Sequence, residues 1–191
     1  MNDNEYMNAA LELAQKAYTL GEVPVGAVVV KKSTGEIVGK GYNRRETDKD
    51  PLAHAEISAI KQASETLGGW RLIDCDIYVT LEPCPMCCGA IINSRIERVV
   101  FGAFDKKSGS AESVVNMFEL PFNHKPEIVS GVEEKKMCEN SERFFCGIKR
   151  KKERNEKENE LGKCKMIRRN VNFQLKCSKR IKKSRKKVVK R

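Results

Sequence analysis

The sequence predicts an α/β domain of three layers, with a central mixed sheet of five strands between helices on both faces. Short β-branched runs alternate with stretches of helical periodicity along residues 5–151, an order typical of a sheet covered by helices. Hydrophobic residues make up 40% of the 191, enough for an ordinary core. The apolar runs fall far short of the ~20 residues that a membrane span needs, so we expect no membrane partner.

The domain is expected to open with a helix and a hairpin. Residues 5–20 place apolar side chains at i, i+3, i+4 and i+7, the stripe of an amphipathic helix. Residues 25–30 are β-branched and apolar, which predicts a buried strand. Ser33-Thr34-Gly35 gives a turn, and residues 36–43 return as an antiparallel strand.

The middle of the domain is expected to repeat helix and strand. Asp50-Pro51 has the form of an N-cap followed by proline in a first helical turn, so we expect a helix from there to about Leu67. Residues 76–81 form a strand. The prolines that follow end this strand and permit a helix over 85–94.

The remaining elements are shorter, except for the last helix. Residues 98–103 form an apolar strand that should lie parallel to the preceding strand, across a helical connection. A short helix over 113–119 and an edge strand over 127–130 follow. Helical periodicity then runs from Val132 to about Lys151.

Charge divides the chain into two parts. Residues 149–191 hold 20 Lys and Arg against 4 Asp and Glu, whereas residues 1–148 hold 17 against 22. The net charge of +11 therefore comes from the end of the chain. We expect a mildly acidic domain over residues 1–152 and a basic, disordered tail over 153–191.

Eight cysteines are many for a chain that we expect in the cytoplasm. The sequence begins with acidic and polar residues and shows no basic region leading into an apolar stretch, which argues against a secretory signal. A disulfide scaffold belongs to secreted proteins. The close pair Cys84 and Cys87 is therefore interpreted first as metal-binding or redox-active.

Cys84, Cys87 and His54 form a candidate zinc site. Two cysteines at i and i+3 around a helix start lie on one face, so both sulfurs can reach one ion. The helix N-terminus favours thiolates, and Pro85 lacks an amide proton that a first turn does not use. His54, at another helix start, would complete the three protein ligands of a catalytic zinc, which leaves the fourth position for water.

Glu56 is the candidate proton shuttle for that water, whose pKa zinc lowers towards neutrality. In the middle of a helix, residues i and i+2 point in nearly opposite directions, so the pair works only if the first turn opens or His54 reaches back. A redox pair or a structural zinc site are the other interpretations of Cys84 and Cys87. The sequence shows no thioredoxin-like context and no second close cysteine pair within the expected domain.

The order His-x-Glu, then a strand, then Pro-Cys-x-x-Cys entering a helix is the signature of zinc nucleobase deaminases. The chain resembles the bacterial tRNA-specific adenosine deaminases of the cytidine/deoxycytidylate deaminase superfamily over about residues 5–150. The matching segments are Glu22–Val28, Gly41–Arg44, Asp50–Ile57, Tyr78–Cys87, Ser94–Ile96 and Val99–Ala103.

This resemblance implies the fold of that superfamily, a homodimer, one zinc ion per subunit, and hydrolytic deamination of adenosine to inosine at wobble position 34 of the tRNA anticodon loop. It implies His54, Cys84 and Cys87 as zinc ligands and Glu56 as the catalytic residue. It further implies that four residues contact the substrate: Asn43 at the flipped base, Asp105 near the sugar and backbone, and Phe144 and Phe145 in a helix beside the RNA groove.

Each of these four substrate residues also has a structural interpretation. Asn43 could cap a strand end, Asp105 could form a turn, and at least one of the two phenylalanines could belong to the core. Two other functions stay open at this point. One is a deaminase of free guanine, cytosine or cytidine, and the other is a catalytically silent RNA-binding subunit with a structural zinc.

Overall fold

A computed structural model describes residues 2–134, 136 and 137. The elements in chain order are α1 (Asp3–Thr19), β1 (Gly26–Lys31), β2 (Glu36–Tyr42), α2 (Arg45–Asp48), α3 (Ala55–Leu67), β3 (Cys75–Leu81), α4 (Pro85–Ser94), β4 (Arg98–Ala103), the 3-10 helix η1 (Met117–Glu119) and β5 (Glu127–Val129). The predicted helix over 132–151, the domain boundary at 152 and the tail lie largely or wholly outside the described residues. Within the described part, no helix is long and apolar enough to cross a membrane.

The strands form one mixed sheet of five, in the order β2-β1-β3-β4-β5. β1 pairs antiparallel with both β2 and β3, whereas β3–β4 and β4–β5 are parallel. Because β3 and β4 are parallel, the segments after Leu81 and Ala103 leave the sheet at the same edge. The predicted five-stranded mixed sheet and the antiparallel hairpin are confirmed.

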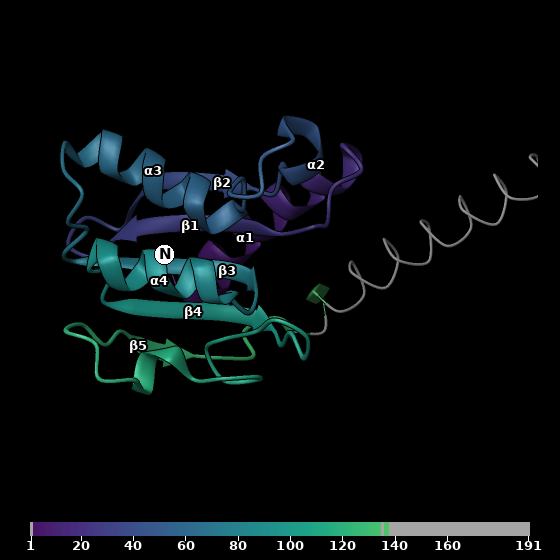
Figure 1. The fold of residues 1–191 in the computed structure, drawn as a ribbon. Coiled ribbons are helices and arrows are strands. Elements are labelled where there is room, and N and C mark those ends of the chain that lie inside the picture. Colours follow the sequence, from purple (N-terminus) through teal and green to yellow (C-terminus); the bar gives the residue numbers. More distant parts are fainter. Residues whose placement is uncertain (1, 135, 138–191) are drawn as a thin grey trace, which may run out of the picture. The chain divides into compact units, whose positions relative to one another are not determined.

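Helices cover both faces of the sheet (Figure 1), and each face buries every second residue of the central strands. Alternate residues of β1, β3 and β4, such as Val28, Tyr78 and Val100, pack against α1 on one face. Their neighbours, such as Val29, Ile77 and Val99, pack with α3 and α4 on the other. Successive strand residues point to opposite faces, so short apolar runs fill both cores and create the predicted three layers.

Gly41 lets α3 approach the sheet closely. A Cβ at Gly41 would overlap the backbone oxygen of Ala55 and the amide nitrogen of Ala59. On the helix side, Ala55, Ala59 and Ala63 are fully buried, because small side chains face the strand. This close contact fixes the first turn of α3 against the sheet, and therefore fixes His54, which directly precedes it.

Two predicted helices begin later than expected. The helix expected from Pro51 begins only at Ala55, because residues 51–54 form a turn in which the Asp50 carboxylate accepts a hydrogen bond from Leu52 N (2.8 Å). That is an Asx turn, which offers the backbone an alternative to helix. Over 113–119, only the 3-10 helix at 117–119 forms, with Asn116 capping it.

Candidate metal centre

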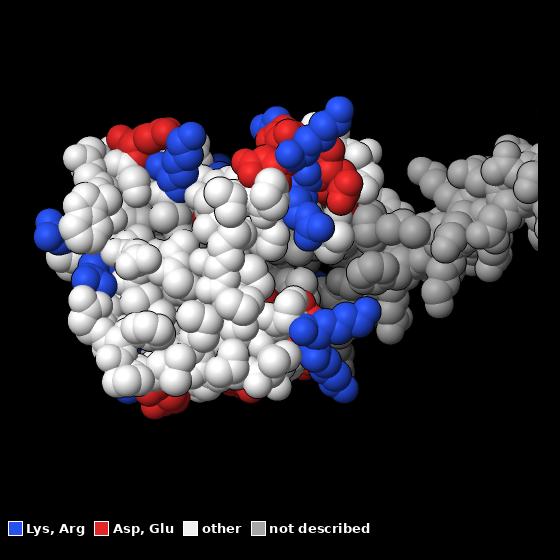
Figure 2. All heavy atoms as spheres, in the orientation of Figure 1, with Lys and Arg blue, Asp and Glu red and all other residues white. Residues whose placement is uncertain are grey.

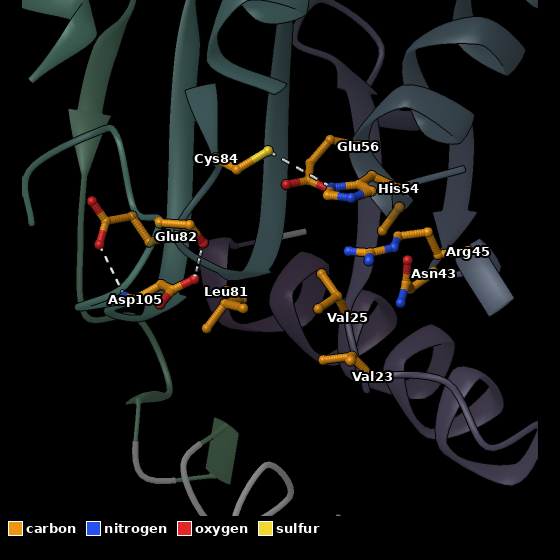
Figure 3. A pocket seen from close by; sticks show the side chains of 12 residues that line it. Val23, Val25, Asn43, Arg45, His54, Glu56, Leu81, Glu82, Cys84 and Asp105 are labelled. Atoms are coloured by element: carbon orange, nitrogen blue, oxygen red, sulfur yellow. Dashed lines mark hydrogen bonds between the residues drawn. The ribbon is translucent and has the colours of Figure 1, made fainter. Parts of the chain in front are cut away.

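Three side chains meet where the first turns of α3 and α4 face each other. His54 is the N-cap of α3 and Cys84 is the N-cap of α4, both with extended backbones. Cys87 lies one turn into α4, behind Pro85 at the first helical position. Neither N-cap side chain caps its own helix with a hydrogen bond, so both are free to point at the gap between the helices (Figure 3).

The three donor atoms form a nearly equilateral triangle. His54 Nδ1 lies 3.7 Å from Cys84 Sγ and 3.6 Å from Cys87 Sγ, and the two sulfurs are 3.6 Å apart. A tetrahedral zinc with Zn–S near 2.3 Å and Zn–N near 2.0–2.1 Å separates its ligand atoms by roughly 3.5–3.8 Å. The donor set fits this ion in both chemistry and spacing, and it leaves one position open.

Electrostatics prepare the two sulfurs differently. Hydrogen bonds from Cys87 and His54 lower the pKa of the Cys84 thiol to about 4, although its burial opposes the shift. The same contact with Cys84, together with burial, raises the pKa of the Cys87 thiol. These contacts favour the thiolate form of Cys84, and a thiolate is the form of cysteine that binds metals.

Glu56 lies beside this cluster, at the second position of α3, and is 4% exposed. His54 is the N-cap of α3 with an extended backbone and stands outside the helix. The opposite directions of residues i and i+2 inside a helix therefore do not apply to His54 and Glu56. Burial raises the pKa of the Glu56 carboxyl above its ordinary range, opposed in part by its own backbone amide and by His54. A carboxyl group of this kind is suited to acid–base work near neutral pH.

The cluster opens on a pocket with a volume of about 160 Å³, which suits one small planar group better than a ligand of drug size. Asn43 and Asp105 line this pocket together with His54, Glu56 and Cys84 (Figure 3). Its other lining residues are Val23, Val25, Arg45, Ala55, Leu81, Glu82 and Ser108. Four of the sequence-predicted site residues in this pocket, Asn43, His54, Glu56 and Cys84, thus come from the starts of α3 and α4 and from the end of β2.

Asn43 is 7% exposed, and its backbone amide donates to Val25 O at 3.0 Å. No residue of the described part hydrogen-bonds its side-chain amide, which leaves both ends of that amide for a ligand. Asp105 is anchored differently, because its carboxylate already accepts hydrogen bonds from Ser108 Oγ (2.5 Å) and Lys107 N (2.9 Å). Phe144 and Phe145 lie outside the described residues.

Residues 1–103 match the family described as the cytidine and deoxycytidylate deaminase zinc-binding region. The chain belongs to this family. The match covers more than half of the chain and includes His54, Glu56, Cys84 and Cys87. A zinc cofactor is thereby confirmed, and the zinc-fitting triangle of donor atoms belongs to the matched region of this deaminase.

Within the family, the similarity is strongest to one branch. A tRNA-specific adenosine deaminase of Bacillus subtilis is 48% identical over 151 residues, which are 78% of this chain and 92% of that protein. A solved structure from a study of A-to-I editing by tRNA:A34 deaminases at the wobble position of transfer RNA is 43% identical, with a TM-score of 0.68, covering 71% and 98% of the two chains. The expected membership of the tRNA-specific branch is confirmed.

A guanine deaminase from Bacillus subtilis shares the fold at a lower level. Its structure is 32% identical with a TM-score of 0.52, over 64% of this deaminase and 88% of that chain. Deaminases named for different substrates thus share this fold, and the fold alone does not decide the substrate.

Sequence reasoning missed several residues of the pocket. Arg45 lines it from the first residue of α2, a helix that no local pattern predicts, and Ser108 lines it from the loop after β4. Glu82 is 2% exposed although it is charged, and its position between an apolar strand and Pro83 was the only available signal. Of the remaining thiols, Cys75 and Cys88 are buried and lie outside the cluster, and burial raises the pKa of Cys75 to about 11.

Proposed function

We propose that this chain deaminates adenosine to inosine at wobble position 34 of a tRNA anticodon loop, with water as co-substrate and ammonia as product. The observation that carries the proposal is the zinc-fitting triangle with a buried carboxyl beside it, at the floor of a pocket open to solvent. It occurs in a chain 48% identical to a tRNA-specific adenosine deaminase. Anticodon-loop bases are single-stranded, so one can enter such a pocket at low unstacking cost.

In this proposal, His54 Nδ1, Cys84 Sγ and Cys87 Sγ hold the zinc ion. When bound there, zinc supplies Lewis-acid activation of a water molecule at neutral pH. These three side chains would set the position of the ion, because the starts of α3 and α4 that hold them pack against the sheet. Glu56, on the first turn of α3, is held beside the same position.

Glu56 moves both protons of the water. Its carboxylate takes the first proton and delivers it to the ring nitrogen next to C6 as the water oxygen bonds to that carbon. It then carries the second proton to the amino group, the C6–N bond breaks, and ammonia leaves. The raised pKa of this buried carboxyl favours such a two-way role, because the group must both accept and release protons near neutral pH.

Asn43 and Asp105 are assigned to the substrate. The unengaged amide of Asn43 can donate to and accept from the edge of a base, which fits recognition of a flipped purine. Asp105 stands on the opposite wall of the pocket, near where the sugar would lie. Phe144 and Phe145 are proposed to border the RNA groove, as the resemblance implies.

The basic residues Arg44 and Arg45, and across the pocket Lys106 and Lys107, are proposed to contact phosphates. Figure 2 shows Lys and Arg side chains on both sides of the hollow in this face. The described domain is otherwise mildly acidic, so a local pair of cationic edges is what an RNA backbone requires. Such contacts weaken steeply with salt.

We also propose a homodimer. Helix α4 contains no charged residue, yet Met86, Gly89 and Ala90 are partly exposed on it. Val114 and Val115, shortly before η1, are 59% and 41% exposed. Figure 2 shows a broad uncharged area on the face where α4 lies, and an apolar area of this kind is typical of an association surface. Light scattering of the full chain should give twice 21.6 kDa, and a mass of one chain would contradict the dimer.

Two further assignments complete the proposal. The enzyme acts in the cytoplasm, where tRNA is modified. The deaminase domain ends near residue 152, and residues 153–191 are a basic tail that catalysis does not require. The relatives support this boundary, since the Bacillus subtilis protein is matched over 92% of its length by 78% of this chain.

The decisive experiment incubates the full-length, zinc-loaded chain with tRNA that carries adenosine at position 34, and detects inosine by digestion and mass spectrometry. We expect inosine at that position alone. Glu56→Gln should lower the rate about 10²–10⁴-fold while zinc stays bound, because general acid–base catalysis supplies a factor of that order. Glu65→Gln, an exposed change on the same helix, is the matched control and should leave the rate unchanged.

Three results would overturn parts of this proposal. Conversion of free guanine, adenosine or cytidine, with no inosine in tRNA, would make the chain a deaminase of small substrates. Tight tRNA binding with no base change in zinc-loaded protein would make it an RNA-binding subunit. Loss of zinc from Glu56→Gln would give Glu56 a structural role.

A further inference from the structure

Glu82 carries an unusual number of hydrogen bonds for a side chain next to a metal-binding segment. Its Oε1 accepts from the backbone amides of Ala111 (3.1 Å), Glu112 (2.8 Å) and Ser113 (2.8 Å). Its Oε2 accepts from the amide of Asp105 (3.0 Å) and from the hydroxyl of Ser113. One buried carboxylate therefore ties both ends of the segment 105–113 to the end of β3.

The amides on Oε1 form a recognisable anion site. Three successive N–H groups that converge on one oxygen make a concave nest with partial positive charge. Hydrogen bonds from such groups to a carboxylate are charge-assisted and stronger than those between neutral groups. The Glu82 carboxylate thus occupies this anion site, and its hydrogen bonds hold the backbone of residues 111–113 in place.

Packing around the same carboxylate confirms how closely the segment is fitted. A Cβ at Gly109 would overlap the Glu82 carboxylate and the backbone oxygen of Asp105. Ser110 N donates to Pro83 O at 2.8 Å, and Glu82 N donates to Ala103 O at 2.8 Å. The segment is therefore held against the residues that lead directly to Cys84.

Two residues of this segment line the pocket. Asp105 and Ser108 do so from its first turn, joined by their own hydrogen bond of 2.5 Å. Figure 3 shows Glu82 directly beside Asp105, on the side of the pocket opposite Asn43 and Arg45. Local hydrogen bonds of Asp105 with Lys107 N and Ser108 Oγ shape the turn itself. Its attachment to the end of β3 comes from Glu82, whose carboxylate accepts from Asp105 N.

We propose that Glu82 is a positioning residue for the substrate. Resting on the proposed function, the inference is that this carboxylate sets the distance between the Asp105–Ser108 wall and the metal centre, and so orients the nucleotide whose base enters the pocket. Glu82 lines the pocket but is not one of the three candidate metal ligands, and its carboxylate is taken up by hydrogen bonds from the segment 105–113. It acts through the segment 105–113, whose amides it gathers.

The chemistry of the site makes a sharp test possible. Glu82→Ala removes a CH₂–COO⁻ group, which added acetate can replace in the vacated nest. Glu82→Gln keeps the shape but turns an NH₂ group towards one set of N–H donors, so the segment loses either Asp105 or residues 111–113. Misplacement of about 1 Å can cost roughly 10²-fold in rate, so we expect kcat/KM for tRNA to fall about 10- to 100-fold in both variants.

Three measurements accompany this rate in the full-length protein. Zinc content should stay at the wild-type value. Amide hydrogen exchange should become faster at Asp105 and at 111–113, while α3 and α4 stay protected. Acetate should restore kcat/KM of Glu82→Ala in a saturable way, and sodium chloride at equal ionic strength should not, which separates rescue from the salt dependence of RNA binding.

Asp3→Asn is the matched control. The Asp3 carboxylate also accepts several hydrogen bonds, from Tyr78 OH (2.8 Å) and from Arg98 (2.6 and 3.0 Å), but it lies at the start of α1, outside the pocket. This variant should leave exchange in 105–113 and kcat/KM unchanged. A fall in kcat/KM in Asp3→Asn equal to that in Glu82→Ala would reduce the effect to general destabilisation.

The inference is overturned if Glu82→Ala keeps wild-type kcat/KM and wild-type exchange, or if acetate does no more than chloride. Should Glu82→Ala fail to fold, Glu82→Gln decides by its rate and exchange. If the wild-type protein itself makes no inosine in tRNA, the proposed function fails. The exchange measurement then still tests whether Glu82 holds the segment, because it needs no substrate.

Discussion

The two ends of the parallel strands β3 and β4 both bury charged side chains, but they arrange them in opposite ways. At the amino ends, Arg98 bonds Asp3 (2.6 Å) and Asp76 (3.4 Å), and Tyr78 donates to Asp3. At the carboxyl ends lie the pocket, Glu56 and the three candidate ligands. Shifted pKa values occur at both ends: the hydrogen bond to Asp3 raises the pKa of Arg98, and burial raises that of Glu56.

The two ends differ in whether neighbouring protein groups compensate the buried charges. At the amino ends, Arg98 forms ion pairs with Asp3 and Asp76. This network stabilises the fold and needs no ligand to balance its charges. At the carboxyl ends, two thiols and an imidazole, all groups that bind metals, converge beside an open pocket, and no described residue hydrogen-bonds the side-chain amide of Asn43. A perturbed pKa alone does not separate these cases, because structural ion pairs perturb pKa values too. Donor geometry beside an open pocket does.

Cys87→Ser gives the largest expected effect and tests the carboxyl ends directly. A serine hydroxyl stays protonated at neutral pH and is a poor zinc ligand, so we expect zinc to be lost on dialysis. Inosine formation should fall at least about 10³-fold, since metal activation is worth several kcal/mol. Metal analysis and the tRNA assay measure both.

The matched control for this change is the next residue. Cys88 Sγ donates to Pro83 O at 3.5 Å and takes no part in the triangle of donor atoms. Cys88→Ser should keep zinc and activity. Retention of stoichiometric zinc by Cys87→Ser would remove Cys87 from the ligand set.

Arg98→Ala, at the amino ends, gives the smaller expected effect. It should lower the stability of the fold and leave zinc binding and catalysis unchanged, the reverse of the pattern expected at the carboxyl ends. It leaves the carboxylate of Asp76, which is 6% exposed, without its cation. Oδ1 of Asp76 already has no hydrogen-bond partner within the described residues. Unfolding in urea should show a loss of about 3 kcal/mol, because breaking a buried pair strands a charge. Zinc content and the rate per folded molecule should not change.

Adding Asp76→Asn to Arg98→Ala should recover part of the lost stability, because the stranded charge is then gone. Recovery of none of it would show that Arg98 stabilises the fold by packing alone. A loss of zinc in Arg98→Ala at temperatures where the protein is folded would contradict the separation of the two ends.

Elements with strong local signals were predicted from the sequence. The helix at 85–94 and the strand at 98–103 have the predicted bounds, because Pro85 marks a first turn and a compact apolar run marks a buried strand. The helix expected from Pro51 to Leu67 ends as predicted but begins only at Ala55, since Asp50 forms a turn with Leu52 in place of an N-cap. The short helix at 45–48 was missed, because it is held by the buried Glu22, which accepts hydrogen bonds from Glu46 N and Thr47 N.

The candidate site likewise has a part that the sequence predicted and a part that it did not. The sequence by itself determined the zinc chemistry, since His54, Glu56, Cys84 and Cys87 sit at fixed spacings within two short motifs. Only the tertiary structure decided that His54 stands before its helix, that Asn43 lines the pocket, and that Glu82 binds the amides of the segment 105–113. The physical reason is the distance along the chain. A motif records contacts between neighbours in the sequence, whereas the pocket is built by contacts such as those of Thr47 N with Glu22 and of Ser113 N with Glu82, which span 25 and 31 residues.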